Sequence, residues 1–308
     1  MKPKTVLSAL GALTLAAVLS AIAIIRSNPP ASSLPPGSQT FEVAGQIREL
    51  DIANKTVRIA HEEIPDYMPA MTMPFNVRDA ALLDELVAGD PVRFQFIVTE
   101  SDSWISRIEK NPSEETNLSA VAADAGTTPQ DRELDRVQTG EVVPDFELVD
   151  QNGEPIRLRD FRGKAVVLTF IYTRCPIPNF CPLMSKNFAD LQSRLAPEFP
   201  GRFVLLSVSI DPRFDRPEVL KRYSARYEAD TRHWKFATGD EEQINGVAGL
   251  MGLLHEPENG LISHDLRTAL ISPDGRLVHL WKSNVWTPYE VQRRVRETLT
   301  GTMDIAAR

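Results

Sequence analysis

The sequence predicts two structured domains of different fold class behind an apolar N-terminal segment. Three observations predict this organisation. The first 26 residues contain a long uncharged run, residues 41–110 contain short strand-like segments, and residues 141–301 alternate buried strand segments with amphipathic helices. We therefore expect a membrane segment, then a small OB-like β-barrel of about five strands, then an α/β domain whose mixed sheet has helices on both faces. A chain of 308 residues is long enough for two such domains.

The N-terminal segment, residues 1–26, has the charge pattern of a membrane anchor. Two lysines precede residues 5–25, which carry no charge and match the roughly 20 residues that a membrane-spanning helix needs. The positive flank favours a single-pass anchor in a bacterial inner membrane with the soluble domains in the periplasm. The alternative is a signal peptide cleaved near the Ala-Ile-Ala of residues 21–23, which would release the protein into the periplasm.

The barrel is predicted for residues 41–110, after a Pro/Ser-rich spacer at residues 27–40. Its strands are expected from short segments with partial alternation of apolar and polar residues. A helix or helical turn that ends at Gly89 is expected between the second and the third of these strand segments. The strand segments are 41–51, 55–64, 91–100 and 104–110, and the helical segment is 78–90.

Residues 111–140 contain few large apolar side chains, which predicts a flexible linker ahead of the α/β domain at 141–301. That domain should begin with a hairpin that turns at Asn152-Gly153, because Asn-Gly favours tight hairpin turns. Its later elements are a buried strand at 165–172, a helix after Cys181, a strand at 202–211, a helix at 216–230, a hairpin that turns at Asp274-Gly275, and a last helix capped by Thr287 with Gly301 past its end. The net charge of −8 gives no indication of a nucleic-acid partner, and we expect none.

The only two cysteines, Cys175 and Cys181, lie close together in the segment TRCPIPNFCPLMS. Cys175 follows a buried strand and Cys181 precedes a helix, and sites on α/β sheets form at such strand ends. Pro176 and Pro178 disfavour a helix between the thiols, so this segment should form a loop. The nearby helix N-terminus favours a low pKa for Cys181. A metal site, a redox pair and a structural disulfide all remain open, since the compartment outside the cytoplasm is oxidising.

Three blocks of this domain resemble the SCO/SenC family of thioredoxin-like copper proteins. They are FRGKAVVLTFIYTRCPIPNFCPLMS around the cysteines, LLSVSIDPRFDRPEVLKRYSARY with Asp211-Pro212, and ISHDLRTALISPDGRLV with His264. The resemblance implies a thioredoxin fold that binds copper through Cys175, Cys181 and His264. Thiolates select Cu(I), and imidazole suits both Cu(I) and Cu(II). The family has three residues between its cysteines, whereas this chain has five. His255 is a less favoured spare ligand.

A methionine cluster marks the predicted barrel. Met71 and Met73 alternate, so on a strand they share one face, and His61 lies ten residues before Met71. One imidazole with two thioethers is a soft ligand set for Cu(I), although methionine also fills gaps in ordinary cores. The segment HEEIPDYMPAMTMPF resembles the CusF-like periplasmic copper-binding domain, a small five-stranded barrel. That resemblance implies His61, Met71 and Met73 as copper ligands, and Met68 stands where the family places a tryptophan, which makes it a further candidate ligand.

The two resemblances together predict a membrane-anchored periplasmic copper chaperone. Its implied role is assembly of the dinuclear copper site of cytochrome c oxidase. The expected partners are the copper-bearing oxidase subunit or another copper acceptor, a periplasmic thiol reductant, and the membrane. The alternatives are a copper resistance or homeostasis protein, or a thiol-disulfide oxidoreductase in which Cys175 and Cys181 form the redox-active pair, although their spacing differs from the usual C-x-x-C.

Overall fold

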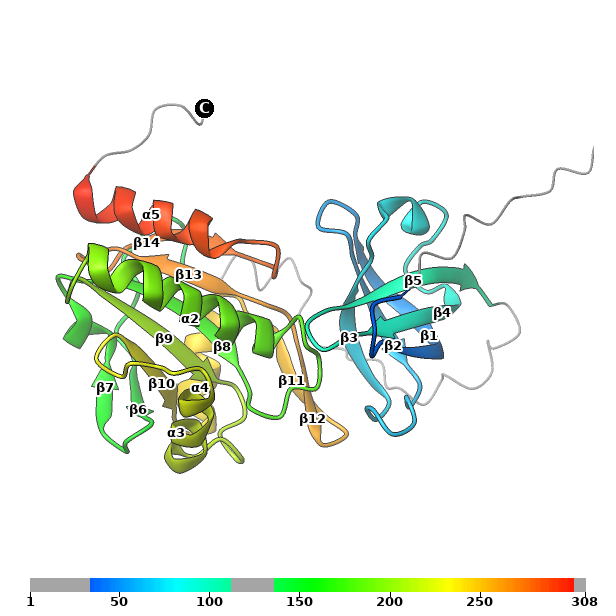
Figure 1. Ribbon diagram of the computed structural model, residues 1–308, viewed down its shortest axis with the longest axis horizontal. Helices are drawn as coiled ribbons and strands as arrows, with labels where there is room; N and C mark the ends of the chain where they lie inside the picture. Colours follow the sequence, from blue (N-terminus) through cyan, green and yellow to red (C-terminus); the bar gives the residue numbers. More distant parts are fainter. Residues whose placement is uncertain (1–33, 112–135, 302–308) are drawn as a thin grey trace, which may run out of the picture. The chain divides into compact units, whose positions relative to one another are not determined.

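The computed structural model describes residues 34–111 and 136–301 (Figure 1). The membrane segment predicted at 1–26 lies outside the described residues, as do the first half of the predicted spacer and most of the predicted linker. Among the helices of the described ranges, none is both long enough and apolar enough to cross a membrane.

The N-terminal domain is a five-stranded antiparallel sheet with strand order β3-β2-β1-β4-β5. A parallel bridge between Val77 and Ile105 joins its two ends and closes the sheet on itself, as a barrel requires. The segment expected to be a helix or helical turn forms only the short 3₁₀ turn η1 (Ala80–Leu83), which the Asp79 side chain caps by accepting from the Ala81 N–H. The strands are β1 (Gln39–Asp51), β2 (Thr56–His61), β3 (Met71–Asn76), β4 (Pro91–Val98) and β5 (Ser103–Lys110).

The interior of this domain takes its residues from alternate positions of β2 and β3. In the antiparallel register His61 lies opposite Met71, and Ile59 lies opposite Met73. Directly opposed residues project to the same face of a sheet. His61, Met71 and Met73 therefore share the buried face, and Phe75 continues it at the next alternate position.

The second domain is built on a seven-stranded mixed sheet with order β14-β13-β8-β9-β10-β6-β7. Strands β8, β9 and β10 run parallel, and the others pair antiparallel to their neighbours. The residues of β8 and β9 are all buried, as expected for parallel strands covered on both faces. The strands are β6 (Glu147–Asp150), β7 (Pro155–Arg157), β8 (Ala165–Ile171), β9 (Phe203–Ser209), β10 (Trp234–Thr238), β13 (Thr268–Ile271) and β14 (Leu277–Trp281), with a 3₁₀ turn η4 (Leu158–Phe161) after β7.

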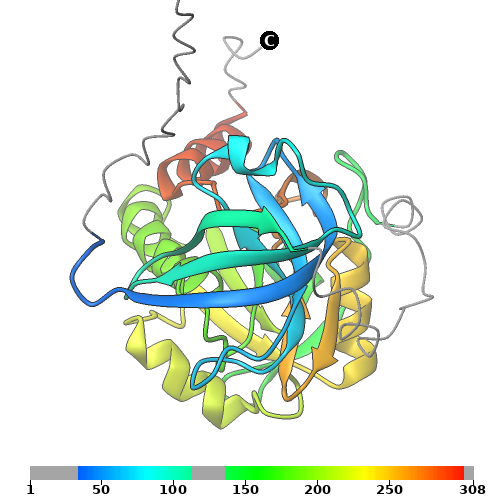
Figure 2. The same cartoon turned by 90° about the vertical axis from the view of Figure 1, so that its right-hand side faces the viewer.

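Helices cover both faces of this sheet, as predicted. Figure 2 shows α4 on the side opposite α2 and α5. Helix α5 has the predicted ends, because the Thr287 side chain accepts from the Glu290 N–H and Gly301 adopts φ 71° after the last turn. The helices are α2 (Cys181–Glu198), α3 (Pro217–Arg226), α4 (Glu241–Leu250) and α5 (Pro288–Thr300).

Two parts of this domain were not predicted from the sequence. Strand β10 and helix α4 extend the α/β alternation, and a separate hairpin precedes β13. That hairpin pairs β11 (His255–Glu258) with β12 (Leu261–His264), and it turns at Asn259-Gly260, both with positive φ. In addition, Val137 is buried and its N–H donates to the Leu250 carbonyl, so the end of the predicted 111–140 linker packs against this domain.

Candidate metal centres

The predicted Cys/Cys/His set comes together in the second domain. Cys175 lies in the turn that follows β8, Cys181 is the first residue of α2, and His264 is the last residue of β12. One ligand atom from each of these three residues lies within 4.8 Å of the other two. Neither cysteine forms a disulfide, so both thiols are available in this arrangement.

His264 is oriented to present a lone pair to the thiols. Its Nδ1 lies 2.7 Å from the carbonyl oxygen of Asp265, which can only accept, so Nδ1 carries the proton. Nε2 of the neutral ring is then unprotonated, and it lies 3.7 Å from the Cys181 Sγ. A ring that donates one N–H to a backbone carbonyl and offers the other nitrogen is the usual arrangement of a metal-ligating histidine. Tyr172 and Phe180 pack edge-on against the ring and fix its plane.

The pKa values of the two thiols are shifted in opposite directions. Burial would raise the pKa of the Cys175 thiol, but a hydrogen bond from the Cys181 thiol acts in the opposite direction, and that pKa lies well below its usual range. Burial and the neighbouring Cys175 sulfur raise the pKa of Cys181 well above its usual range. The prediction of a low pKa for Cys181 was wrong, because that side chain is fully buried and the cost of burying a thiolate exceeds the benefit of the helix N-terminus. Cys175 is therefore the more acidic thiol of the pair.

Two carboxylates brace the segment that carries Cys175, and only one of them was considered from the sequence. Asp215, which sequence reasoning missed, accepts from the Thr173 N–H at 2.9 Å, from the Thr173 hydroxyl and from the Ser209 hydroxyl. Asp211, the aspartate of the Asp-Pro block, forms an ion pair at 2.6 Å with Arg174. The two aspartates of the Asp-Pro block thus hold the two residues that precede Cys175. The sequence signal for Asp215 was its position in that block, four residues after Asp211.

In the N-terminal domain, His61 makes the same kind of backbone contact as His264. Its Nδ1 lies 2.6 Å from the Glu62 carbonyl oxygen, which leaves Nε2 unprotonated. This Nε2 is buried and has no hydrogen-bond partner among the described residues. Burial lowers the pKa of His61 to about 4, so the ring is neutral at pH 7. A buried nitrogen that lacks a partner is costly in an ordinary core, and a metal ion would satisfy it.

The three methionines near His61 are almost fully buried. Met71 and Met73 lie on the same face of β3 as predicted, and Met68 lies just before that strand, bridged to Ile64. Core filling alone would place the thioethers among hydrocarbon, yet these methionines line a small cavity. His61 with these thioethers forms a donor set whose chemistry fits Cu(I).

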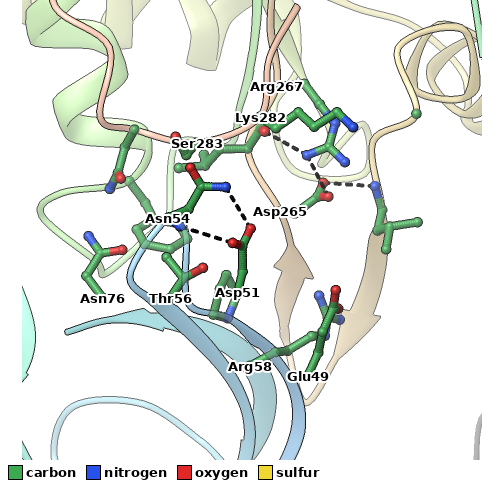
Figure 3. Close-up of a pocket in the computed structure, with 16 residues that line it drawn as sticks. Glu49, Asp51, Asn54, Thr56, Arg58, Asn76, Asp265, Arg267, Lys282 and Ser283 are labelled. Atoms are coloured by element: carbon green, nitrogen blue, oxygen red, sulfur yellow. Dashed lines mark hydrogen bonds and ion pairs between the residues drawn. The ribbon is translucent and has the colours of Figure 1, made fainter. Parts of the chain in front are cut away.

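A separate polar cavity of about 270 Å³ contains none of the predicted ligands (Figure 3). It is lined by polar side chains, among them Asp51, which accepts from Asn54, and Asp265, which pairs with Arg267 at 2.7 Å. Asp265 also accepts from the Leu254 N–H. These bonds fix the residue whose carbonyl orients His264, so this cavity supports the Cys/Cys/His set without belonging to it.

Comparisons with known proteins agree with both domains. The family described as SCO1/SenC matches residues 135–300, and the family described as copper binding periplasmic protein CusF matches residues 40–110. An SCO1 protein homolog of Bacillus subtilis is 30% identical over 154 residues, which are 49% of this chain and 78% of that protein. An SCO2-like protein of Rickettsia typhi is 31% identical over 153 residues, covering 47% of this chain and 70% of that protein.

Solved structures of SCO proteins are also similar to this chain. A SCO1/SenC family lipoprotein from Bacillus anthracis is 31% identical with a TM-score of 0.47, covering 51% of this chain and 94% of that one. A structure of BsSco, a member of the Sco family of cytochrome c oxidase assembly proteins, is 26% identical with a TM-score of 0.46, covering 54% and 98%. Because the family match spans more than half of the sequence, the chain belongs to the SCO1/SenC family, and it carries a CusF-like domain ahead of its thioredoxin-like domain.

Proposed function

We propose that this protein is a membrane-anchored periplasmic copper chaperone that supplies the dinuclear copper site of cytochrome c oxidase. The observation that carries the proposal is the clustering of three soft or borderline ligands within 4.8 Å at the end of β8. Thiolates and imidazole favour copper over the hard cations, which prefer oxygen. The proposed ligands are Cys175, Cys181 and His264 in the thioredoxin-like domain, and His61, Met71 and Met73, with Met68, in the CusF-like domain.

Membership of the SCO1/SenC family supports copper as the cargo and the oxidase copper-bearing subunit as the acceptor. The CusF-like domain supports a location outside the cytoplasm. The proposed single-pass anchor depends on the uncharged run at residues 5–25 and its positive flank. A periplasmic thiol reductant would keep both cysteines available, because that compartment is oxidising.

The residues of the Cys/Cys/His set would contribute in different ways. Cys175 has the lower pKa of the two thiols, so it loses its proton to bind a positively charged ion more readily than Cys181 does. His264 offers the Nε2 lone pair in a fixed orientation. Cys181 must release its proton when it binds, which makes capture at the buried end of the set pH-dependent. Tyr172 and Phe180 pack against the ring of His264, which is nearly fully buried.

An anaerobic Cu(I) titration of the reduced full-length chain against a chromophoric competitor tests this proposal. We expect two tight sites per chain. Cys175→Ser with Cys181→Ser should abolish one site, and Met71→Leu with Met73→Leu should abolish the other. The exchange of Ser193, an exposed residue of α2, for alanine is the control and should change neither. The proposal is overturned if the chain binds no Cu(I) tightly, or if Cu(I) binding is unchanged when both cysteines are replaced.

The acceptor is tested in cells. A strain lacking the protein should lose cytochrome c oxidase activity, and added copper should restore part of it if delivery is the missing step. Expression of the Cys175→Ser variant should fail to restore activity. If the deletion instead lowers copper tolerance and leaves oxidase activity unchanged, the protein serves copper resistance or homeostasis.

A second candidate function is favoured by the contrast between the two thiols. A thiol of lowered pKa at Cys175 beside a thiol of raised pKa at Cys181 is the arrangement that an attacking and a resolving cysteine need in thiol-disulfide exchange. His264→Ala discriminates the two functions. A copper chaperone should lose Cu(I) retention in this variant, whereas an oxidoreductase should keep most of its exchange rate with a disulfide substrate.

A further inference from the structure

The two proposed ligand sets border one cavity. It has a volume of about 20 Å³, and its walls include Met68, Met71 and Met73 from the CusF-like domain and Cys175 and His264 from the thioredoxin-like domain. About 10–15 Å³ is enough to hold one water molecule, so the cavity has room for a single small ion. Each set therefore presents donors to the same space.

The other two proposed ligands, His61 and Cys181, each lie next to a residue that borders this cavity. His61 lies opposite Met71 in the β2–β3 register, on the same buried face. Cys181 lies behind His264, with its Sγ 3.7 Å from Nε2. The donors thus form a continuous series from an imidazole in the barrel, through thioethers and the Cys175 thiol, to the buried thiol of Cys181.

Contacts between strand β3 and the β11–β12 hairpin lie beside the cavity. β3 is an edge strand, and the backbone groups of Thr72 face away from β2. Glu258 accepts from the Thr72 N–H at 2.8 Å, and the Ser263 hydroxyl donates to the Thr72 carbonyl. Asn259, in the hairpin turn, donates to the carbonyl of Ala70. Side chains of the hairpin therefore satisfy the open edge where the methionines lie.

The loop between the cysteines contacts the barrel as well. The Tyr67 hydroxyl donates to the Pro176 carbonyl at 3.0 Å. Ser103 and Asn179 form a reciprocal pair, in which the Ser103 hydroxyl donates to the Asn179 side chain and the Asn179 amide donates to the Ser103 carbonyl. Both residues are buried. Two of the five residues between the cysteines, Pro176 and Asn179, thus contact the barrel. The longer spacing in this chain provides these contacts.

We propose that this cavity is a copper transfer point, where one Cu(I) ion is held at the same time by a thioether of the CusF-like domain and by Cys175 or His264. The inference rests on the proposed function, since it requires both sets to bind copper. Copper remains Cu(I) throughout: a thioether–copper bond breaks as a thiolate–copper bond forms, and a thiol that is still protonated releases its proton to water. The methionines and His264 are nearly fully buried, and Cys175 is partly exposed, so the ion passes between the sets with limited access to solvent.

Copper X-ray absorption of the full-length chain, labelled with selenomethionine and loaded with one equivalent of Cu(I), tests the shared site. Selenium in place of the methionine sulfur distinguishes thioether from thiolate donors. We expect both Cu–Se and Cu–S scattering from the same ion. Met68→Leu with Met71→Leu and Met73→Leu should remove the Cu–Se contribution, which assigns it to these residues and not to Met184 of α2.

A docking variant, Ser103→Ala with Glu258→Ala, removes one contact from each side of the cavity without touching a proposed ligand. It should lose Cu–Se scattering at one equivalent and regain it at two, when the separated barrel fills independently. The matched control is Ser106→Ala with Glu256→Ala, the same residue types on the same strands, both exposed and neither in contact across the cavity. The control should behave as the unmodified chain does.

The outcomes separate this inference from the proposed function. Cu–S scattering without Cu–Se at one equivalent in the unmodified chain leaves the chaperone function standing and overturns the shared site. Equal Cu–Se scattering in the docking variant and the unmodified chain at one equivalent also overturns it. No copper bound at one equivalent means that the proposed function itself fails.

Discussion

His61 and His264 make the same backbone contact in two unrelated folds. Each ring places Nδ1 within 2.7 Å of the carbonyl oxygen of the residue that follows it, Glu62 in one case and Asp265 in the other. Each histidine also ends an antiparallel strand, so the chain can turn its next carbonyl back toward the ring. Both rings are therefore held as the tautomer that leaves Nε2 free for a metal. This shared geometry leads to a first prediction about pH.

The apo chain should lose stability as the pH falls below 6.5, and His61 should cause most of the loss. Its pKa falls from 6.5 to about 4 on folding, so the unfolded chain binds a proton in this interval and the folded chain does not. Stability is then fully present above pH 6.5 and is lost as the pH falls toward 4, by about 3 kcal/mol at about 1.4 kcal/mol for each pKa unit. Urea unfolding at pH 7 and pH 4.5 measures the loss, and it should be much smaller in His61→Gln. An equal loss in that variant contradicts the prediction.

The two thiols of the reduced apo chain should react at different rates. Cys175 is partly exposed and has the lowered pKa, whereas Cys181 is fully buried and has the raised pKa. Alkylation requires an accessible thiolate, so iodoacetamide at pH 7 should modify Cys175 at least about 10-fold faster. Mass spectrometry of the cysteine peptides over time gives both rates. In urea the rates should converge, and similar rates in the folded chain would sink the assignment of Cys175 as the more acidic thiol.

The sequence was sufficient to predict which candidate ligands the fold brings together, because their placement follows from residue type and short spacing. Met71 and Met73 needed only the period of a strand, and Cys175, Cys181 and His264 came together as the family resemblance implied. The β11–β12 hairpin was missed although Asn259-Gly260 is a strong turn signal, because the flanking strands are short and only partly apolar.

The contacts around the cavity could not be predicted in the same way. Thr72 and Glu258 are 186 residues apart, and nothing in either local sequence indicates that a carboxylate will complete the edge of β3. Which of the two thiols has the lower pKa could also not be predicted from the sequence. The helix N-terminus near Cys181 is visible in the sequence, but the complete burial of that side chain follows only from tertiary packing.

Gly45→Ala should destabilise the CusF-like domain. A Cβ at this position of β1 would lie 2.5 Å from Ile59 Cγ2 and 2.7 Å from the Ala60 carbonyl oxygen, and the backbone oxygen cannot move without disturbing the pairing with β2. Overpacking of this kind costs about 1–3 kcal/mol. Gly246→Ala in α4 is the control, because a Cβ there meets nothing within 4 Å and alanine favours a helix by about 0.5–1 kcal/mol. Thermal unfolding should therefore shift in opposite directions, and a neutral Gly45→Ala would show that the strands can separate.

Asp215→Ala should weaken both folding and copper binding, whereas Asp215→Asn should do neither strongly. The buried carboxylate accepts from the N–H and hydroxyl of half-buried Thr173 and from the hydroxyl of buried Ser209. Alanine leaves these donors without partners, at a cost of about 3 kcal/mol in the free energy of unfolding. Asparagine keeps an oxygen for the Thr173 N–H, and a hydroxyl can rotate to accept from its amide, so we expect a loss below about 1 kcal/mol.

The copper measurement separates a positioning role from a purely structural one. Loss of a bracing group around a metal site typically lowers affinity about 10- to 100-fold, so Asp215→Ala should lower the Cu(I) affinity of the cysteine site within that range under conditions where the variant is still folded. The barrel site should keep its affinity in the same titration. Asp190→Asn, which removes only an exposed ion pair with Arg194 on α2, is the control and should change stability by less than about 0.5 kcal/mol. If folded Asp215→Ala binds Cu(I) as tightly as the unmodified chain, Thr173 does not need this carboxylate to place Cys175.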